Sequence, residues 1–164
     1  MTKLKKIKKI SPAHAAMISC FKFNRQFGIG ARYGSEWMVS EFLDNEVACI
    51  GYDKEETPEI FSQFKTLKKG DIIFMKAFGP SSTQLCIMGI GIVTGNKVYH
   101  VSDELGWGIN VKWVFGHGDN DEIYLLDKLG QDKHRNVRIG TLYEEFHPQI
   151  KRQIASILAE SIVR

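Results

Sequence analysis

The sequence has few cysteines and no long hydrophobic run, and each of these absences excludes a class of protein. Its three cysteines are an odd number without C-x-x-C spacing, and Cys49 and Cys86 lie in apolar runs. This usage is typical of packed thiols in a reducing compartment rather than of a disulfide framework. The apolar stretches are a few residues long, far short of the roughly 20 that span a bilayer. We therefore expect a cytoplasmic protein without a membrane partner.

The sequence also lacks the clustered side chains of a metal site or a catalytic centre. Its five histidines are scattered, and no two of them stand four residues apart. Zinc sites need nitrogen or sulfur ligands at short spacing, so we expect neither a metal nor a cofactor. There is no nucleophile elbow and no Walker loop, and thiols buried in apolar strands are poor nucleophiles. These absences predict a protein that is not an enzyme.

Length and charge indicate one globular domain with a basic start. Of 164 residues, 43% are apolar and 25% are charged, as in ordinary soluble domains. Five of the 22 basic residues are lysines within the first ten positions, and without them 17 basic residues face 19 acidic ones. We expect residues 1–12 to be a basic, flexible segment and residues 13–164 to be a single domain. Its balance of −2 does not predict a uniformly basic nucleic-acid binder.

The pattern of apolar residues predicts an α+β fold, most simply a small, strongly bent β-barrel with short helices packed around it and a C-terminal helix. The turn-forming residues between apolar runs predict strands at 15–23, 47–52, 71–77, 85–93, 97–101 and 110–115. Helices are predicted after an N-cap at Ser35, from Pro58 to about Gly70, and over 148–163. Ile150, Ile154, Ile157, Leu158 and Ile162 should form the apolar stripe of the last helix.

Two groups of glycines suggest close approach to the backbone. Gly28, Gly30 and Gly34 are predicted to form a loop between a strand and a helix, where backbone N–H groups can hold an anion. Arg25 and Arg32 flank this segment and favour a phosphate contact, although a flexible connector fits the spacing equally well. Gly89 and Gly91 lie on one face of their strand, which predicts a bulge, a tight bend or an approaching group.

The order of motifs resembles the PUA-like superfamily and, within it, the EVE-like modules related to YTH domains. The likeness is strongest to the DNA-binding modules at the front of modification-dependent restriction GTPases and covers about residues 17–115. The resemblance depends on the order and spacing of the motifs, because each motif alone is weak. The matching residues are Phe42, Ile50–Asp53, Lys69–Ile73, Lys76, Met88–Gly95 and Val111–Trp113.

The resemblance implies a bent barrel whose aromatic-lined pocket accepts a flipped or single nucleobase, often a modified one. By position it implies Trp37, Tyr52 and Trp113 as pocket aromatics and Asp53 as the acceptor for the edge of the base. Trp113 fits an ordinary core position equally well. The remaining expected site residues are Phe78 at the rim, Lys76 near a phosphate, Ser35 at the mouth with the glycine-rich loop, and Tyr33 and Arg32 beside it.

Two departures from the family pattern accompany this resemblance. Tyr52 stands where the pattern has tryptophan, which keeps a stacking face but reduces its area. The chain carries no attached GTPase or nuclease domain, so a defence-related role would need a separate effector enzyme.

Three functions remain open from the sequence. The first is a non-enzymatic module that binds a modified or flipped base of DNA or RNA. The second is a binder or sponge of a free nucleotide, including a cyclic signalling nucleotide, which the modest charge of the body favours. The third is a small adaptor whose barrel and last helix mediate assembly.

Overall fold

A computed structural model describes residues 11–78, 85–116, 124–126 and 140–163 of the chain. The basic residues 1–10 lie outside these ranges, so the expectation of a flexible start stays a prediction.

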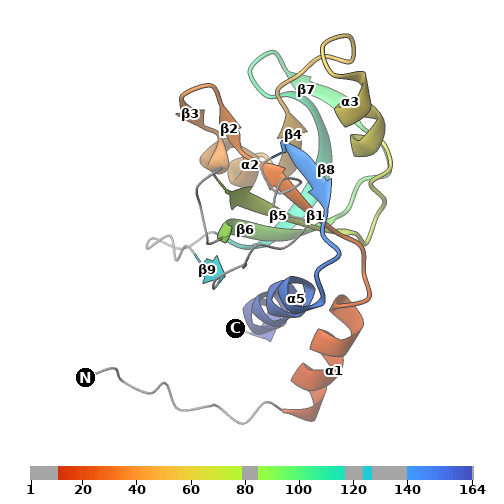
Figure 1. Cartoon of the computed structure of the whole chain (residues 1–164), viewed down its shortest axis with the longest axis vertical. Coiled ribbons are helices and arrows are strands. Elements are labelled where there is room, and N and C mark those ends of the chain that lie inside the picture. Colours follow the sequence, from red (N-terminus) through yellow and green to blue (C-terminus); the bar gives the residue numbers. More distant parts are fainter. Residues whose placement is uncertain (1–10, 79–84, 117–123, 127–139, 164) are drawn as a thin grey trace, which may run out of the picture.

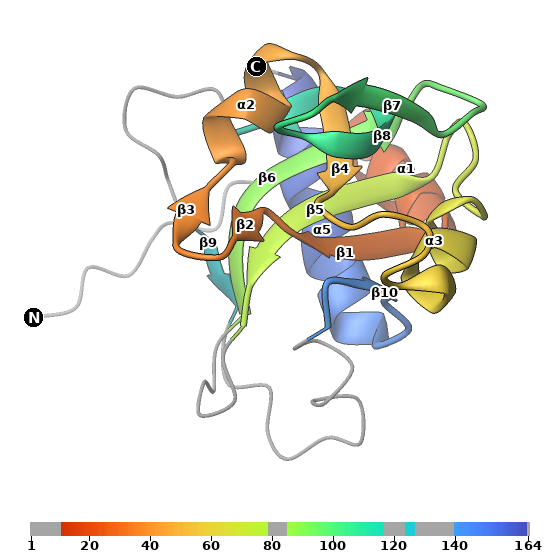
Figure 2. The ribbon, with the colours of Figure 1, turned by 90° about the horizontal axis from the view of Figure 1, so that it is seen from above.

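The core of the molecule is one strongly bent, eight-stranded sheet (Figures 1 and 2). Its main path runs β10-β1-β5-β6-β8-β4, with β7 paired to β8 and β9 paired to β6. Strands β1 and β5 are parallel, and the other pairs are antiparallel. The strands are β1 (Gln26–Gly30), β4 (Val47–Ile50), β5 (Ile72–Ala77), β6 (Leu85–Val93), β7 (Tyr99–Ser102), β8 (Gly106–Phe115), β9 (Tyr124–Leu126) and β10 (Leu142–Glu144).

In the described part of the chain, four helices and a small hairpin accompany this sheet. The helices are α1 (Pro12–Phe21), α2 (Val39–Asp44), α3 (Pro58–Phe64) and α5 (Pro148–Val163). The hairpin pairs β2 (Arg32–Tyr33) with β3 (Glu36–Trp37). The predicted α+β class, with a bent sheet and a C-terminal helix, is confirmed, and the sheet forms a half-barrel rather than a closed one.

Both faces of the sheet are buried, and successive side chains of β5 alternate between the two faces. Ile73 and Met75 belong to the core inside the bend, together with residues of α2 and α3. Ile72 and Phe74 point the other way, into a second core under α5. This period of two is the geometry of a strand covered on both sides.

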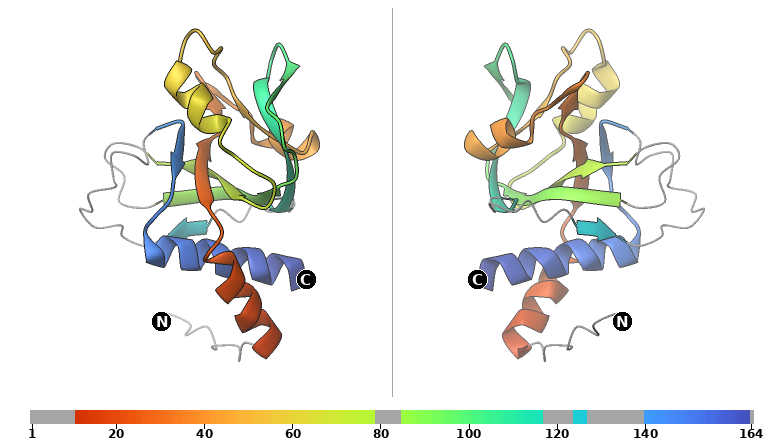
Figure 3. Two further views of the ribbon diagram at one scale, coloured as in Figure 1. Left: turned by 90° about the vertical axis from the view of Figure 1, so that its right-hand side faces the viewer. Right: turned by 90° about the vertical axis from the view of Figure 1, so that its left-hand side faces the viewer.

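Helix α5 closes the outer face of the sheet, as Figure 3 shows. Ile150, Ile154, Ile157 and Leu158 are buried there, as the apolar stripe predicts. The inclusion of Ile162 was wrong, because its side chain is 44% exposed beyond the last turn that the sheet covers. The apolar face of α5 is therefore already occupied by its own sheet.

Gly91 makes room for Val111 and Trp113, and Gly89 makes room for Met75, whose Cε would lie 2.3 Å from a Cβ there. A Cβ atom at Gly91 would lie 2.9 Å from the Trp113 ring, 2.5 Å from Val111 Cγ1 and 2.8 Å from the Lys112 carbonyl oxygen. The β6–β8 register also shifts between Ile90 and Gly91. The expected bulge and close approach are confirmed. The approaching groups are Met75 of β5 at Gly89, and Val111, the Lys112 carbonyl and the Trp113 ring of β8 at Gly91.

The predicted first strand at 15–23 was wrong, because this segment forms α1. Ser11 caps it by accepting a 3.2 Å hydrogen bond from the His14 N–H, and Pro12 takes the first helical position. The half-buried residues His14, Met17, Ile18 and Phe21 follow helical spacing, and α1 packs against α5.

The predicted glycine-rich loop was wrong in its first half. Gly28 and Gly30 lie in β1, and a Cβ at Gly28 would come 2.3 Å from the Tyr143 ring. This glycine therefore serves ring packing rather than a turn. The helix expected directly after Ser35 begins at Val39, because Gly34 (φ 61°) and Ser35 form the two-residue turn of the β2–β3 hairpin.

The other predicted elements are found with small changes at their ends. β6 and α5 have the predicted bounds, and Pro58 begins α3. α3 ends at Phe64, before the predicted Gly70, and β8 begins four residues earlier than predicted, at Gly106. Within the described residues, no helix is long and apolar enough to span a membrane.

The packing at Gly91 predicts that Gly91→Ala will destabilise the protein. The new methyl group must displace Val111 and a backbone carbonyl, which should cost about 1–3 kcal/mol of unfolding free energy. Gly30→Ala is the matched control, because its Cβ meets only the Thr141 carbonyl oxygen at 3.8 Å. Urea unfolding of both variants measures the difference, and equal midpoints would contradict this account of the bend.

Candidate functional site

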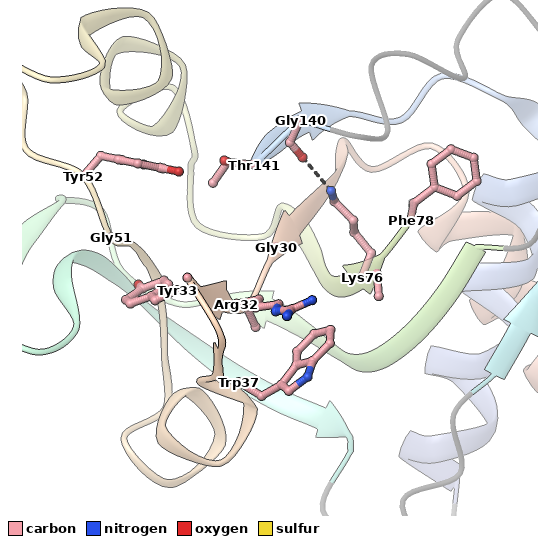
Figure 4. A pocket seen from close by; sticks show the side chains of 13 residues that line it. Gly30, Arg32, Tyr33, Trp37, Gly51, Tyr52, Lys76, Phe78, Gly140 and Thr141 are labelled. Carbon is pink, nitrogen blue, oxygen red and sulfur yellow. Dashed lines mark hydrogen bonds between the residues drawn. The ribbon is translucent and has the colours of Figure 1, made fainter. Parts of the chain in front are cut away.

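A cavity of about 450 Å³ opens beside the β2–β3 hairpin, where β1, β5 and the segment after β4 meet (Figure 4). Six of the nine predicted site residues line it: Arg32, Tyr33, Trp37, Tyr52, Lys76 and Phe78. The other lining residues are Gly30, Ala31, Gly34, Gly51, Ala77, Gly140 and Thr141. Sequence segments far apart in the chain therefore converge on one pocket.

The hairpin supplies a paired cation and indole. Arg32 and Trp37 are register partners across the two strands, and the guanidinium carbon lies 5.5 Å from the centre of the Trp37 ring. This distance is typical of a cation–π contact. Trp37 remains 49% exposed, so the ring keeps area for a ligand.

Tyr33 anchors the hairpin to the rest of the sheet. Its hydroxyl donates a 2.9 Å hydrogen bond to the Leu105 carbonyl, and its ring packs against the backbone of Gly51. Burial is the main cause that raises the pKa of this phenol far above its usual value, so it stays neutral. Tyr33 thus forms a fixed wall of the pocket.

Tyr52 follows Gly51 on the opposite side of the cavity from Lys76, as Figure 4 shows. Its ring is 41% exposed and its hydroxyl points into the open space toward Thr141. Exposed tyrosine faces are suited to stacking on a planar group, because they combine a large apolar area with few rotatable bonds.

Lys76 lies at the end of β5 on the same face as Phe74, since both contact the Tyr143 ring. The β5–β6 register shifts beside it, because Met75 pairs with Gly89 and Lys76 pairs with Ile87, which leaves Met88 of β6 as the extra residue. The Lys76 Nζ donates a 2.5 Å hydrogen bond to the Gly140 carbonyl and lies 5.8 Å from the centre of the Tyr143 ring. Lys76 is only 5% exposed, and burial lowers its pKa from 10.5 to about 8.

Phe78 touches the pocket but belongs mainly to the core under α5. It is 8% exposed, and in Figure 4 its ring lies on the far side of Lys76 from Tyr52. The expected rim position therefore leaves little of its face open to a ligand.

Three predicted residues do not line the cavity. Trp113 is 2% exposed and its Nε1–H donates to the Val47 carbonyl at 3.1 Å, so it is a core residue. Asp53 is exposed beyond the pocket, and its N–H donates to Glu56 Oε2 at 2.9 Å. Ser35 occupies the hairpin turn, where its neighbour Gly34 lines the cavity instead.

Arg25, the other arginine expected near a phosphate, is held by carboxylates. It lies 3.5 Å from Asp71 and 3.6 Å from Glu144, and its guanidinium covers the Phe27 ring at 4.7 Å. Its charge is therefore engaged within the fold, away from the cavity.

No sequence pattern indicates the wall made by Gly140 and Thr141. These residues precede β10, a three-residue strand that pairs with β1 and brings them beside Lys76. Neither residue type indicates a site, and only the pairing places them there. Among the residues that the structure describes, no group of three His, Cys, Asp or Glu side chains could hold a metal ion.

Comparisons with known proteins give a distant structural similarity. No protein-family profile matches the chain, and no curated protein matches it in sequence. Among solved structures, it is similar to the YTH domain of the Zygosaccharomyces rouxii MRB1 protein in complex with N6-methyladenosine RNA. The two chains are 13% identical, with 84% of this chain and 88% of that chain covered and a TM-score of 0.47. A similarity of this size assigns no ligand to the present chain.

The different placement of two tryptophans predicts losses of stability that differ in size. Trp113→Ala should cost about 3–5 kcal/mol, because it empties a core site and removes a buried hydrogen bond. Trp37→Ala should cost less than about 1 kcal/mol, because half of the ring is already exposed. Denaturant unfolding checks both values, and similar losses would contradict the assignment of Trp37 to the pocket wall.

The lowered pKa of Lys76 predicts a pH-dependent gain from Lys76→Met. Between pH 8 and 10.5 the unfolded chain holds the lysine proton more tightly than the folded chain, so wild-type stability rises with pH there. The stability of Lys76→Met relative to wild type should therefore be greatest below pH 8. It should decline by about 3 kcal/mol toward pH 10.5, at 1.36 kcal/mol per pKa unit. Denaturant unfolding of both proteins at each pH gives this difference; a constant difference would show that the ammonium is not desolvated.

Proposed function

We propose that the protein is a non-enzymatic binding module that takes a flipped or single nucleobase of nucleic acid, often a modified one, into the cavity beside the hairpin. The observation that carries this proposal is the pair of half-exposed aromatic rings, Trp37 and Tyr52, on the walls of one cavity. Base–aromatic stacking contributes about 1–3 kcal/mol per base. The cavity volume lies within the range of small-ligand sites, about 300–1,000 Å³.

The net charge of the chain favours a single or extruded base as the ligand over a base recognised within a duplex. Apart from the N-terminal lysines the chain is slightly acidic, whereas a duplex reader ordinarily presents a broad basic face. Extruding a base costs a few kcal/mol, which stacking and hydrogen bonds in the pocket must offset. Substrates whose target base is already unpaired should therefore bind best.

A second candidate is a binder of free nucleotides, and two of the residues that line the cavity favour it. Arg32 and Lys76 both line the cavity, and a free nucleotide carries a phosphate for them to contact. The adaptor role has less support, because the apolar stripe of α5 packs against its own sheet.

Direct titration of a ligand panel tests the proposal. Single- and double-stranded oligonucleotides, with and without methylated or hydroxymethylated bases, are compared with free mono-, cyclic and dinucleotides at low and moderate salt. The proposal predicts modification-dependent binding of single-stranded oligonucleotides that falls about 5- to 100-fold in Tyr52→Ala, because a stacking face is lost. Trp37→Ala should lose affinity in the same range.

The matched control is Tyr99→Ala. Tyr99 is 40% exposed, close to the value for Tyr52, but it lies on β7 and bonds to Asn110 away from the cavity. Its removal should leave binding unchanged. Tight binding of a free nucleotide with little salt dependence would move the second candidate to the front. Absence of any binding, with self-association in light scattering, would contradict both and favour the adaptor.

A further inference from the structure

Gly30 contributes main chain to the cavity wall at the point where β1 ends. It pairs with Lys76 of β5 on one side, and on the other its N–H donates a 2.8 Å hydrogen bond to the Thr141 carbonyl. All three residues line the cavity, and Figure 4 shows them between Tyr52 and Phe78. A ligand in this part of the cavity therefore lies against the backbone of a paired strand.

The backbone conformation of Gly30 does not require a glycine. Its φ lies outside the left-handed region, in contrast to that of Gly34 in the hairpin turn, which is 61°. Glycine in a strand costs stability relative to alanine, because it loses more conformational freedom on folding. Such a glycine commonly marks a place where a ligand or another backbone comes close.

Packing distinguishes Gly30 from Gly28, which lies on the same face of β1. A Cβ at Gly28 would come 2.3 Å from the Tyr143 ring, so this glycine serves the core. For a Cβ at Gly30, the nearest atom of the described residues is the Thr141 carbonyl oxygen at 3.8 Å, an ordinary van der Waals distance. The missing side chain of Gly30 thus leaves an opening the size of a methyl group in the cavity wall.

The surroundings of this opening suit a methyl group on a base. A carbonyl oxygen has two lone pairs, and the oxygen of Thr141 accepts from the Gly30 N–H. Polarised C–H groups also contact carbonyl oxygens, at about 3.3–3.6 Å. The C–H groups of a methyl on a base nitrogen or an aromatic ring carbon are polarised by the ring. The opening therefore favours a methyl group over hydrogen and has no room for a larger substituent.

We propose that Gly30 is the residue that selects a methylated base, because the methyl group on the edge of the base occupies the space that the absent Cβ leaves beside the Thr141 carbonyl. This inference rests on the proposed function. Trp37 and Tyr52 would stack the ring of any base. The opening at Gly30 would distinguish the methylated base from the unmodified one.

Gly30→Ala tests the proposal by placing a methyl group of the protein in this opening. Single strands that carry one N6-methyladenine or one 5-methylcytosine are titrated into both proteins, together with the same strands carrying adenine or cytosine. Affinity for the methylated strand that the wild type prefers should fall about 5- to 150-fold, the range for an extra methyl group in filled space. Affinity for its unmodified counterpart should stay nearly unchanged.

Urea unfolding shows whether Gly30→Ala keeps the fold. Its midpoint should equal or exceed that of the wild type, because alanine loses less freedom than glycine when the strand forms. The ratio of the affinities for methylated and unmodified strands is then a readout that a purely structural glycine would not move.

Ala77→Val is the matched control within the same cavity. Ala77 lines the cavity from the end of β5, so the substitution adds methyl groups to another part of the wall. Any loss of affinity should be equal for methylated and unmodified strands, so the ratio should keep its wild-type value. Loss of the preference in this variant would contradict selection at position 30.

A series of ligands tests the size of the opening without any substitution. Strands with N6-ethyladenine or 5-ethylcytosine are compared with their methylated counterparts on the wild-type protein. The methylated strand should bind most tightly, and the ethylated strand should bind more weakly because its second carbon overlaps the wall. Equal or tighter binding of the ethylated strand would overturn a space limited to one methyl group.

Failure of this inference differs from failure of the proposed function. Equal losses for both strands in Gly30→Ala, no loss for either, or a wild type without preference for methylation would each overturn selection by Gly30. Binding that still weakens in Tyr52→Ala would then leave the proposed function standing. Absence of binding to every strand would overturn both.

Discussion

The position of the Trp113 indole is the constraint on which the shape of the molecule depends. The ring needs the space that Gly91 leaves on β6, and its Nε1–H donates to the Val47 carbonyl on β4. These contacts join the central strand β6 to the edge strand β4 across β8. Since a large indole sits inside the curve and no side chain opposes it on β6, the sheet bends around the ring.

The bend has a direct consequence for the candidate site. It brings the segment after β4, which carries Tyr52, toward the ends of β1 and β5, which carry Gly30 and Lys76. The Tyr33 hydroxyl then fixes the hairpin to the Leu105 carbonyl, so that Arg32 and Trp37 face the same space. The pocket therefore results from the curvature of the sheet, and its aromatic and cationic walls come from the hairpin, β5 and the segment after β4.

Much of the sheet could be predicted from alternating patterns and turn residues, because the apolar side chains of β5, β6 and β8 form clear runs in the sequence. Segment 15–23 is predicted as a strand because its apolar composition hides helical spacing, although Ser11 and Pro12 are a start signal for a helix. The strand β1 was missed because Gly28 has a packing role under Tyr143 that only tertiary structure reveals.

Site residues could be predicted where a local turn or strand places the side chain. They could not be predicted where the path of the backbone or a distant strand pairing places it. Trp37 and Arg32 come together through a two-residue turn, and Tyr52 directly follows a predicted strand. Asp53, one residue further, is outside the cavity because the backbone turns back toward Glu56. Gly140 and Thr141 depend on a pairing between β10 and β1 that no local pattern shows.

The most direct measurement for the central claim is NMR observation of the indole N–H signals of Trp37, Trp107 and Trp113 during titration. The ligands are a single-stranded oligonucleotide with methylated bases and the free 5′-monophosphates. The account predicts that the Trp37 signal and the backbone amides of Gly30 and Gly51 shift together, while the Trp113 signal stays in place. Shifts confined to residues outside the cavity, with Trp37 unchanged, would contradict a nucleobase pocket at this site.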